Sequence, residues 1–299
     1  MQLSKTKSLI ILHIIIFIWG FTGILGELIQ INSIPLVFNR MIIAFLSLII
    51  FEFFFLNNKK IPLKNKIYFF GTGILISIHW VLFFEAINIY NVSLAVTCLS
   101  TTAFFTSIID PIFKKKKIKK HEILLSFFVI IGILVIFTYP EENDLKLREK
   151  AIILSIFSAM FASIFTSLNS IFIEKKNSSF QITKYEMLGG SIFTFLYLIF
   201  KKQVNIDLIP KGNDIIYMFI LAVICTSLAY LISVEIMKKI KPFTMNISVN
   251  LEPIYAMILA IIIFKDQEVM STGFYLGALI IIVSIFLNSI FKKHINKKS

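Results

Sequence analysis

Residues 123–138 read ILLSFFVIIGILVIFT, a run that contains no charged side chain. A helix that crosses a bilayer needs about 20 mostly apolar residues. Similar runs recur along the whole chain of 299 residues, of which 57% are apolar and 16% are charged, whereas a soluble domain is about 25% charged. The composition therefore excludes an ordinary soluble enzyme and indicates an integral membrane protein.

Apolar runs separated by charge clusters predict ten membrane-spanning helices. None of these runs alternates between polar and apolar residues as the strands of a membrane barrel do, so we expect an all-α membrane protein. The first run is followed by further spans and by no small-residue cleavage site, which favours a retained helix over a signal peptide. The ten predicted spans are 8–28, 34–56, 67–88, 93–113, 122–139, 151–173, 183–200, 214–237, 243–264 and 271–291.

Basic residues are divided unevenly between the two sets of loops. If the N-terminus is cytoplasmic, the cytoplasmic segments hold 22 of the 30 Lys and Arg residues and the outer segments hold seven. The positive-inside rule then predicts a multi-pass protein of the inner or plasma membrane with both termini in the cytoplasm. Most of the positive charge behind the net charge of +13 would then form a collar of cytoplasmic Lys and Arg residues that faces anionic lipid. The bilayer is therefore an expected partner, and nucleic acid is not.

Sequence motifs for a metal site, a hydrolase or an ATPase are absent from the chain. Its two cysteines, Cys98 and Cys225, fall in different predicted spans at different depths, which disfavours a disulfide between them. We therefore expect no cofactor, no metal and no enzymatic activity.

The pattern of spans repeats after the fifth span. Shifting the sequence by 151 residues places Asn91–Lys117 over Pro242–Glu268 without a gap. A second alignment, which matches Asp110-Pro111 to Glu252-Pro253, needs a gap. Because five is odd, two halves of five helices cross the membrane in opposite senses, as in many secondary transporters. The predicted domains are a first repeat 1–140, an outer linker loop 141–150, a second repeat 151–292 and a basic cytoplasmic tail 293–299.

Several short motifs keep a fixed order along these spans. They are Trp19-Gly20, Arg40 with Ala44, Pro242, Glu252-Pro253, and Glu268 with Gly277. In these motifs and over nearly its whole length, the sequence resembles the drug/metabolite transporter superfamily, specifically the ten-helix EamA-type carriers. The resemblance implies two inverted five-helix bundles around a central cavity, and export or exchange of amino acids and other small metabolites. Two positions depart from the family pattern: Lys117, where Glu is frequent, and Thr102, where Pro is frequent.

Ionisable side chains inside hydrocarbon are costly, so each one requires a reason. Glu252 falls at the centre of the ninth predicted span, where Pro253 predicts a bend that deprives the carbonyl of Val249 of its helical partner. Tyr255 is expected on the face of Glu252, whereas Asn250 points to another side. Together they place a titratable group, an amide and an aromatic ring at the depth where inverted-repeat carriers bind. A neutral glutamate that serves packing alone is the alternative interpretation.

His79 is the second titratable group at mid-membrane depth, and Trp80 follows it. Histidine titrates near neutral pH, which suits proton coupling or a pH-dependent gate, although a core histidine is the alternative. Trp19 lies near the middle of the first span and needs a partner for its N–H. Tyr230 lies somewhat inward of the middle of the eighth span. Both aromatic residues could line a cavity or only pack.

Arg40 lies in the second span, about six residues from its outer end. It suits either a structural ion pair with Glu27 or Glu85, or an anchor for a substrate carboxylate. Six other carboxylates are interpreted as interfacial or capping groups at span ends: Glu52, Asp110, Glu122, Glu174, Glu186 and Glu235. Two of them, Glu186 and Glu235, are also candidates for lining an inner mouth.

These features predict a secondary transporter that moves a small polar organic solute, such as an amino acid, by alternating access, with protons as a candidate coupling ion. The predicted binding or coupling residues are Glu252, His79, Trp80, Trp19, Asn250, Tyr255, Tyr230 and Arg40. A membrane enzyme acting on lipid is one alternative, but it would need clustered His, Asp or Glu, and the four His residues are scattered. A channel is the other alternative, and it would conduct ions without turnover.

Overall fold

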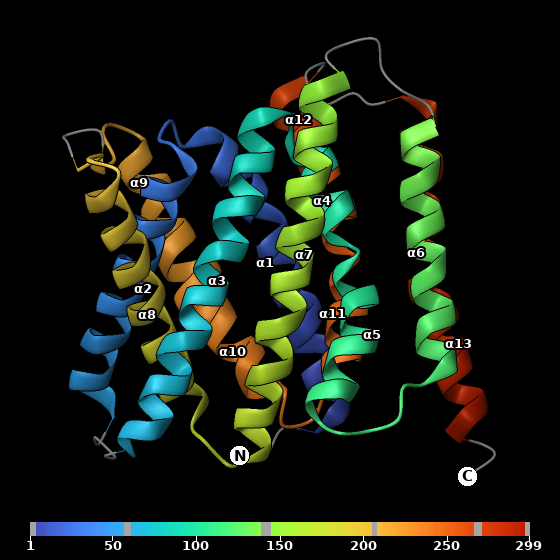
Figure 1. Cartoon of the computed structure of the whole chain (residues 1–299), viewed down its shortest axis with the longest axis horizontal. Coiled ribbons are helices and arrows are strands. Elements are labelled where there is room, and N and C mark those ends of the chain that lie inside the picture. Colours follow the sequence, from blue (N-terminus) through green and yellow to red (C-terminus); the bar gives the residue numbers. More distant parts are fainter. Residues whose placement is uncertain (1–3, 57–60, 139–144, 205–207, 266–270, 297–299) are drawn as a thin grey trace.

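The computed structural model describes residues 4–56, 61–138, 145–204, 208–265 and 271–296, except for some side chains in α6 and α13. Within these ranges the regular structure is helical, as predicted, and no strand occurs. The long helices stand side by side in one bundle (Figure 1). In chain order they are α1 (Lys5–Leu28), α2 (Ser33–Phe55), α3 (Leu63–Ile89), α4 (Val92–Leu99), α5 (Thr102–Phe113), α6 (Lys120–Thr138), α7 (Leu145–Glu174), α8 (Ser179–Phe200), α9 (Asp214–Phe219), the π-helix η2 (Ile220–Leu228), α10 (Ala229–Ile236), α11 (Pro242–Val249), α12 (Glu252–Phe264) and α13 (Thr272–Asn296).

Each predicted span corresponds to one helix or to a run of short consecutive helices. Seven of these segments are long and apolar enough to cross a membrane, judged over the described residues: α1, α2, α3, α4 with α5, α7, α9 to α10, and α11 with α12. The other three are α8, which carries Lys184 and Glu186, and the incompletely described α6 and α13. The chain is thus a multi-pass membrane protein, while the number of ten spans stays a prediction.

Large apolar side chains cover the outside of the bundle. Phe53 is 81% exposed and Phe200 is 79% exposed, which would be unfavourable in water but suits the hydrocarbon of a bilayer. One boundary differs from the prediction at the start of the second half. Lys146, Arg148 and Lys150, expected in an outer loop, lie in the first turns of α7, because this helix extends beyond its apolar core.

The contacts between helices keep their pattern when the two halves are exchanged. α1 packs against α12 as α7 packs against α5, and α3 packs against α8 as η2 packs against α2. α6 packs against its own counterpart, α13. The first helices of the halves run in opposite directions, since α1 begins and α7 ends at the lower side of the bundle (Figure 1). This is the arrangement expected of an inverted repeat.

Helices α3 and α8 approach each other closely because glycines face the contact. A Cβ atom on Gly73 would lie 2.0 Å from the carbonyl oxygen of Glu186, and one on Gly189 would lie 2.2 Å from that of Phe70. No larger residue fits at either position without moving a backbone, which is how small residues serve helix packing in membranes. The contact brings the middle of α8 against α3, beside the site described below.

Both halves contain one broken helix at matching positions. In the second half, α11 ends at Val249 and α12 begins at Glu252, so the bend predicted beside Pro253 is confirmed. In the first half, α4 ends at Leu99 and α5 begins at Thr102 without a proline. There the carbonyls beside the break accept hydroxyls: Thr101 Oγ1 donates to the oxygen of Cys98 at 2.8 Å and Thr102 Oγ1 to that of Leu99 at 2.7 Å.

Candidate functional site

A small cavity lies between the two halves in the middle of the bundle. Its volume is about 90 Å³, well below the roughly 300–1,000 Å³ of pockets that hold drug-sized ligands. Six of the eight residues predicted for the site line it: Trp19, Arg40, His79, Trp80, Tyr230 and Glu252. The walls between them are largely apolar and include Phe83, Leu99, Phe165, Met237, Met245 and Val249. Sequence reasoning therefore found the depth of a cavity that both halves build.

Arg40 belongs to the cavity lining and is only 2% exposed. Its Nε donates a hydrogen bond to Thr226 Oγ1 at 2.6 Å. The guanidinium carbon lies 3.8 Å from the centroid of the Trp80 ring, a cation–π contact. Nη1 has no hydrogen-bond partner among the described residues although it is buried. The guanidinium is thus fixed on one edge and leaves a buried donor unused.

The contacts of Arg40 differ from the ion pair with Glu27 or Glu85 that was one of its expected roles. Glu85 accepts a hydrogen bond from Ser33 Oγ at 2.7 Å, and Arg40 is held by Thr226 and Trp80. The orientation of α2 about its own axis explains the difference, because it directs the Arg40 side chain toward η2 and α3 and not toward the outer rim. Depth alone could not reveal that direction.

Glu252 is the acidic counterpart of Arg40 in the cavity. It begins α12 and is 6% exposed, in the first turn, where the helix dipole stabilises a negative charge. Among the described residues no hydrogen bond to its carboxyl group and no direct ion pair with Arg40 is found. A cation and an anion therefore line one cavity without neutralising each other by contact.

His79 and Trp19 are each anchored by backbone of the opposite half. His79 Nδ1 lies 2.9 Å from the carbonyl oxygen and 2.7 Å from Oγ of Ser158 on α7, which leaves Nε2 as the nitrogen able to meet a solute. Trp19 Nε1 donates to the carbonyl oxygen of Cys225 in η2 at 3.1 Å, so the expected partner for its N–H is confirmed. Both rings are held in place as parts of the cavity wall.

Asn250 and Tyr255 are not part of the cavity lining. The centroid of the Tyr255 ring lies 5.5 Å from that of the Phe17 ring, in an edge-to-face arrangement. A Cβ atom on Gly20 would lie only 2.9 Å from the Cβ of Tyr255. Tyr255 therefore packs against α1. Asn250 sits in the break between α11 and α12, buried and with Nδ2 unpartnered within the described chain. Glu252 and Tyr255 lie three residues apart in the same helix, α12, but Tyr255 is directed to α1 by its contacts with Phe17 and Gly20.

Glu186 was not predicted to be buried at the site, and it is 0% exposed. Tyr230 Oη donates to its Oε2 at 3.2 Å, and Asn169 Nδ2 donates to Tyr230 Oη at 2.7 Å. The predicted span began at residue 183, which made Glu186 a terminal residue, but α8 begins at Ser179. The pair Gly189-Gly190 just beyond was a usable signal, because a glycine pair in a membrane helix marks close packing.

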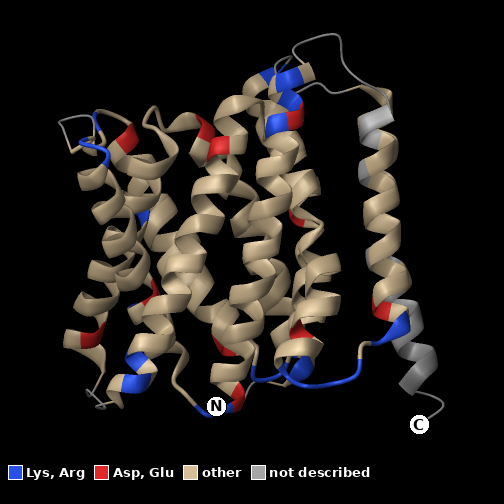
Figure 2. Ribbon diagram, viewed as in Figure 1, with Lys and Arg blue, Asp and Glu red and all other residues tan. Residues whose placement is uncertain are grey.

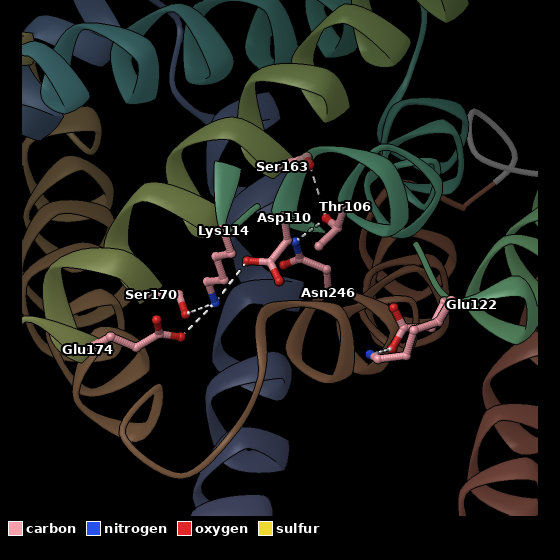
Figure 3. A network of polar contacts seen from close by, with 9 residues as sticks. Thr106, Asp110, Lys114, Glu122, Ser163, Ser170, Glu174 and Asn246 are labelled. Carbon is pink, nitrogen blue, oxygen red and sulfur yellow. Dashed lines mark hydrogen bonds and ion pairs between the residues drawn. The ribbon is translucent and has the colours of Figure 1, made fainter. Parts of the chain in front are cut away.

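A polar network joins the lower ends of α5 and α7 (Figure 3). Lys114 Nζ lies 2.9 Å from Glu174 Oε1 and 3.0 Å from Asp110 Oδ1, and it donates to Ser170 Oγ at 2.7 Å. The contact with Asp110 is electrostatic, because that oxygen lacks hydrogen-bond geometry. Asp110 and Glu174 lie at helix ends, as expected, but Lys114 between them is a nearly buried cross-link and not a member of an exposed collar.

A second chain of polar contacts ties the two broken helices together. Asn246 Nδ2 on α11 donates to Thr106 Oγ1 on α5 at 2.7 Å, and Thr106 Oγ1 lies 3.1 Å from Ser163 Oγ on α7 (Figure 3). Asn246 also lines the cavity. One side of the cavity is thus closed by hydrogen bonds that cross between the halves.

Two related halves, built of apolar helices around a small, largely apolar cavity that contains a few charged and polar groups, define the class of this protein as a membrane transporter of small molecules. The sequence model of the EamA-like transporter family matches residues 6–138 and again residues 149–290. The chain therefore belongs to the EamA-like transporter family, in agreement with the resemblance. Domain boundaries at 140 and 151, the absence of enzymatic activity and the roles of the site residues stay predictions. Glu268, one of the motif residues, and the end of the basic tail lie outside the described residues.

A solved structure, described only as "Crystal structure of protein", has the same fold. It matches with a TM-score of 0.74 over 98% of this chain and 99% of that chain, at 11% sequence identity. At that identity the likeness concerns the fold alone. Among curated proteins the comparison finds no match.

Proposed function

We propose that this protein carries small zwitterionic solutes, amino acids above all, across the inner or plasma membrane by alternating access. The observation that carries the proposal is the pair of separated opposite charges in one cavity. Arg40 keeps an unpartnered Nη1, and Glu252 faces the same space without a hydrogen bond from the described chain. A solute that brings its own carboxylate and ammonium group would satisfy both.

The chemistry of the lining supports this class of solute. A carboxylate on Arg40 forms a charge-assisted hydrogen bond, worth about 1.5–3 kcal/mol, and Trp80 holds the guanidinium in position from its face. An ammonium group would lie against Glu252. The apolar rings of Phe83 and Phe165 beside them suit a hydrocarbon side chain such as that of leucine.

Alternating access would use the inverted halves as its two moving parts. Wide hollows of about 700 Å³ and 770 Å³ open at the upper and lower ends of the bundle, and the small cavity lies between them. In the proposed cycle of a ten-helix carrier, the contacts of Lys114 and Asn246 open to release the solute toward the lower side. No ATPase motif occurs in the sequence, so facilitated exchange or an ion gradient would supply the driving force.

The proposed orientation puts the lower side of the bundle in the cytoplasm. A run of lysines between α5 and α6 lies at that side (Figure 2), where the positive-inside rule favours it. Cys98 and Cys225 are buried, so a cysteine introduced as Lys116→Cys can be labelled almost without background. A membrane-impermeant thiol reagent should label it only after intact cells are opened. Labelling of intact cells would reverse the orientation.

Counterflow in proteoliposomes tests the proposed function. Vesicles loaded with unlabelled L-leucine should accumulate labelled L-leucine from outside. Arg40→Gln should reduce the rate at least tenfold, and Arg40→Lys should restore little of it, because the planar guanidinium stacks on Trp80 in a way that an ammonium group cannot. Glu149→Gln, a change to an exposed carboxylate of α7, should leave the rate unchanged.

Two results would contradict the proposal. Undiminished counterflow in folded Arg40→Gln protein would remove Arg40 from the site. Ion currents through the purified protein that greatly exceed solute turnover would indicate a channel in place of a carrier.

A further inference from the structure

We infer that Glu186 is the proton-binding group that couples solute movement to a proton gradient, an inference whose transport role rests on the proposed function. Glu186 lies outside the cavity lining and is separate from the groups assigned to solute binding. It belongs to α8, at the point where this helix touches the backbone of Gly73 on α3.

The carboxyl group of Glu186 is only half satisfied. Its Oε2 receives the hydroxyl of Tyr230 at 3.2 Å, while its Oε1 is buried and has no hydrogen-bond partner within the described chain. Asn169, which donates to the same hydroxyl, also keeps an unpartnered buried oxygen, Oδ1. Buried polar atoms are nearly always paired, so unpaired oxygens at one junction of α7, α8 and α10 require an explanation.

Another buried carboxylate on a neighbouring helix shows what a structural arrangement looks like. Glu52 on α2 accepts from Lys184 Nζ at 2.9 and 2.7 Å on its two oxygens and from Gln181 Nε2 at 2.9 Å. Both oxygens are used and the charge is neutralised. A buried carboxylate that lacks such partners is costly, so the surroundings of Glu186 suit a group that gains and loses a proton as the transporter changes conformation.

The buried charged and titratable groups on the elements around Glu186 already have other partners. On α2, Glu52 pairs with Lys184 of α8 and Arg40 bonds Thr226; on α3, His79 is held by Ser158; on α10, Glu235 accepts from Ser179 and Lys238. Besides these, α10 presents Tyr230, and α7 presents the neutral Asn169. Glu85 on α3 also accepts from a neutral group, Ser33, but it is not fully buried. Among the buried carboxyl groups that the structure describes on these elements, Glu186 is the one whose hydrogen-bond partners are all neutral.

Tyr230 connects this carboxyl group to the cavity. Its ring lines the cavity, 6.3 Å from the ring of Trp80, while its hydroxyl reaches Glu186. A phenol is both donor and acceptor. In the proposed step the hydroxyl transfers its proton to Glu186 Oε2 and takes a proton from hydronium on the cavity side, which leaves water, so that one proton is taken up and no electron is transferred. A hard metal cation bound at Glu186 in place of the proton would need about six or more oxygen ligands, and the described side chains around Glu186 supply fewer.

Infrared difference spectroscopy tests proton binding without any solute. Purified full-length protein is titrated with acid and base, and the carbonyl band of a protonated carboxylic acid is followed. Wild type and Glu252→Gln should share one such band that titrates, and Glu186→Gln should lose it. Glu186→Asp, which keeps a titratable group, should shift the band. A spectrum unchanged by Glu186→Gln, or a band that does not titrate, would overturn the inference.

Transport of L-leucine in proteoliposomes then tests coupling. An imposed pH gradient should drive uphill accumulation by wild type and by the control Glu149→Gln. Glu186→Gln should keep counterflow at zero gradient but lose the gradient-driven accumulation at least tenfold. Wild-type counterflow without any response to the pH gradient, or a response to a sodium gradient alone, would refute proton coupling. Absence of wild-type counterflow would refute the proposed solute while the infrared result still decides whether Glu186 binds the proton.

Discussion

The two broken helices of this transporter occupy equivalent places but carry different chemistry. The break between α4 and α5 is made by Ser100 and Thr101, and that between α11 and α12 by Asn250 and Leu251. The segment after the first break starts with Thr102, and the segment after the second starts with Glu252 and Pro253. The backbone shape is therefore shared, and the ionisable group belongs to one half.

This difference shows that the helix break belongs to the fold of both halves, whereas the charged group beside it belongs to the site. Since the first half breaks without a proline, the break follows from the packing of these segments against α7 and α1 and not from one residue type. The charges are divided instead: the first half supplies Arg40 and the second supplies Glu252. In the proposed alternating-access cycle, a solute held between Arg40 and Glu252 would contact both halves.

The largest effect is expected from removing the charge at the second break. Glu252→Gln should lower L-leucine counterflow about 10- to 100-fold, since a charged hydrogen bond is worth about 1.5–3 kcal/mol. Thr101→Val changes the residue that the shift of 151 aligns with Glu252. Its hydroxyl bonds the carbonyl of Cys98 in the preceding helix, so the rate should stay within about twofold of wild type. Equal losses in both variants would show that the halves contribute alike and would remove the asymmetry.

An intermediate effect is expected where the two broken helices are joined. Asn246→Ala removes the hydrogen bond to Thr106 between α11 and α5 and should lower the free energy of unfolding by about 1–3 kcal/mol, measured as a lower thermal midpoint in detergent. Ser248→Ala is the matched control on α11, because Ser248 bonds only the carbonyl of Thr244. A control as destabilised as Asn246→Ala would mean that the contact between the halves adds nothing.

The smallest effect is expected from exchanging the residues that follow the breaks. Thr102→Pro places a proline at the first residue of α5, where proline is well tolerated, and Pro253→Ala removes it from the start of α12. Each should change the free energy of unfolding by less than about 1 kcal/mol. A loss of several kcal/mol in either variant, measured by the same thermal assay, would show that the break depends on local sequence and not on packing.

Much of the site could be predicted because depth in a membrane helix can be counted. Trp19, Arg40, His79, Tyr230 and Glu252 were selected for their positions in apolar runs, and they meet in one cavity. What counting could not provide is the direction in which a side chain points. Tyr255 lies in the same helix as Glu252, yet it packs against Phe17 of α1 and not into the cavity, because α1 covers that part of α12.

Glu186 shows the second limit of sequence reasoning. Its predicted place at a span end followed from apolar run length, whereas α8 extends four residues further, from Ser179. Its burial also depends on Gly73, a residue more than a hundred positions away in the chain, whose lack of a side chain admits the backbone of α8. The nearby pair Gly189-Gly190 indicates close packing, but it does not identify α3 as the helix that is approached.

The sequence by itself determined that this chain is a multi-pass helical membrane protein made of two repeats, and it determined which polar groups lie deep in the bilayer. These properties follow from apolar run length, charge position and a rise of about 1.5 Å per residue. The tertiary structure alone decided that Arg40 and Glu252 share a cavity, that Lys114 joins α5 to α7, and that Glu186 lies against α3. Rotation about a helix axis and contact between distant helices are set by the packing of side chains far apart in the chain.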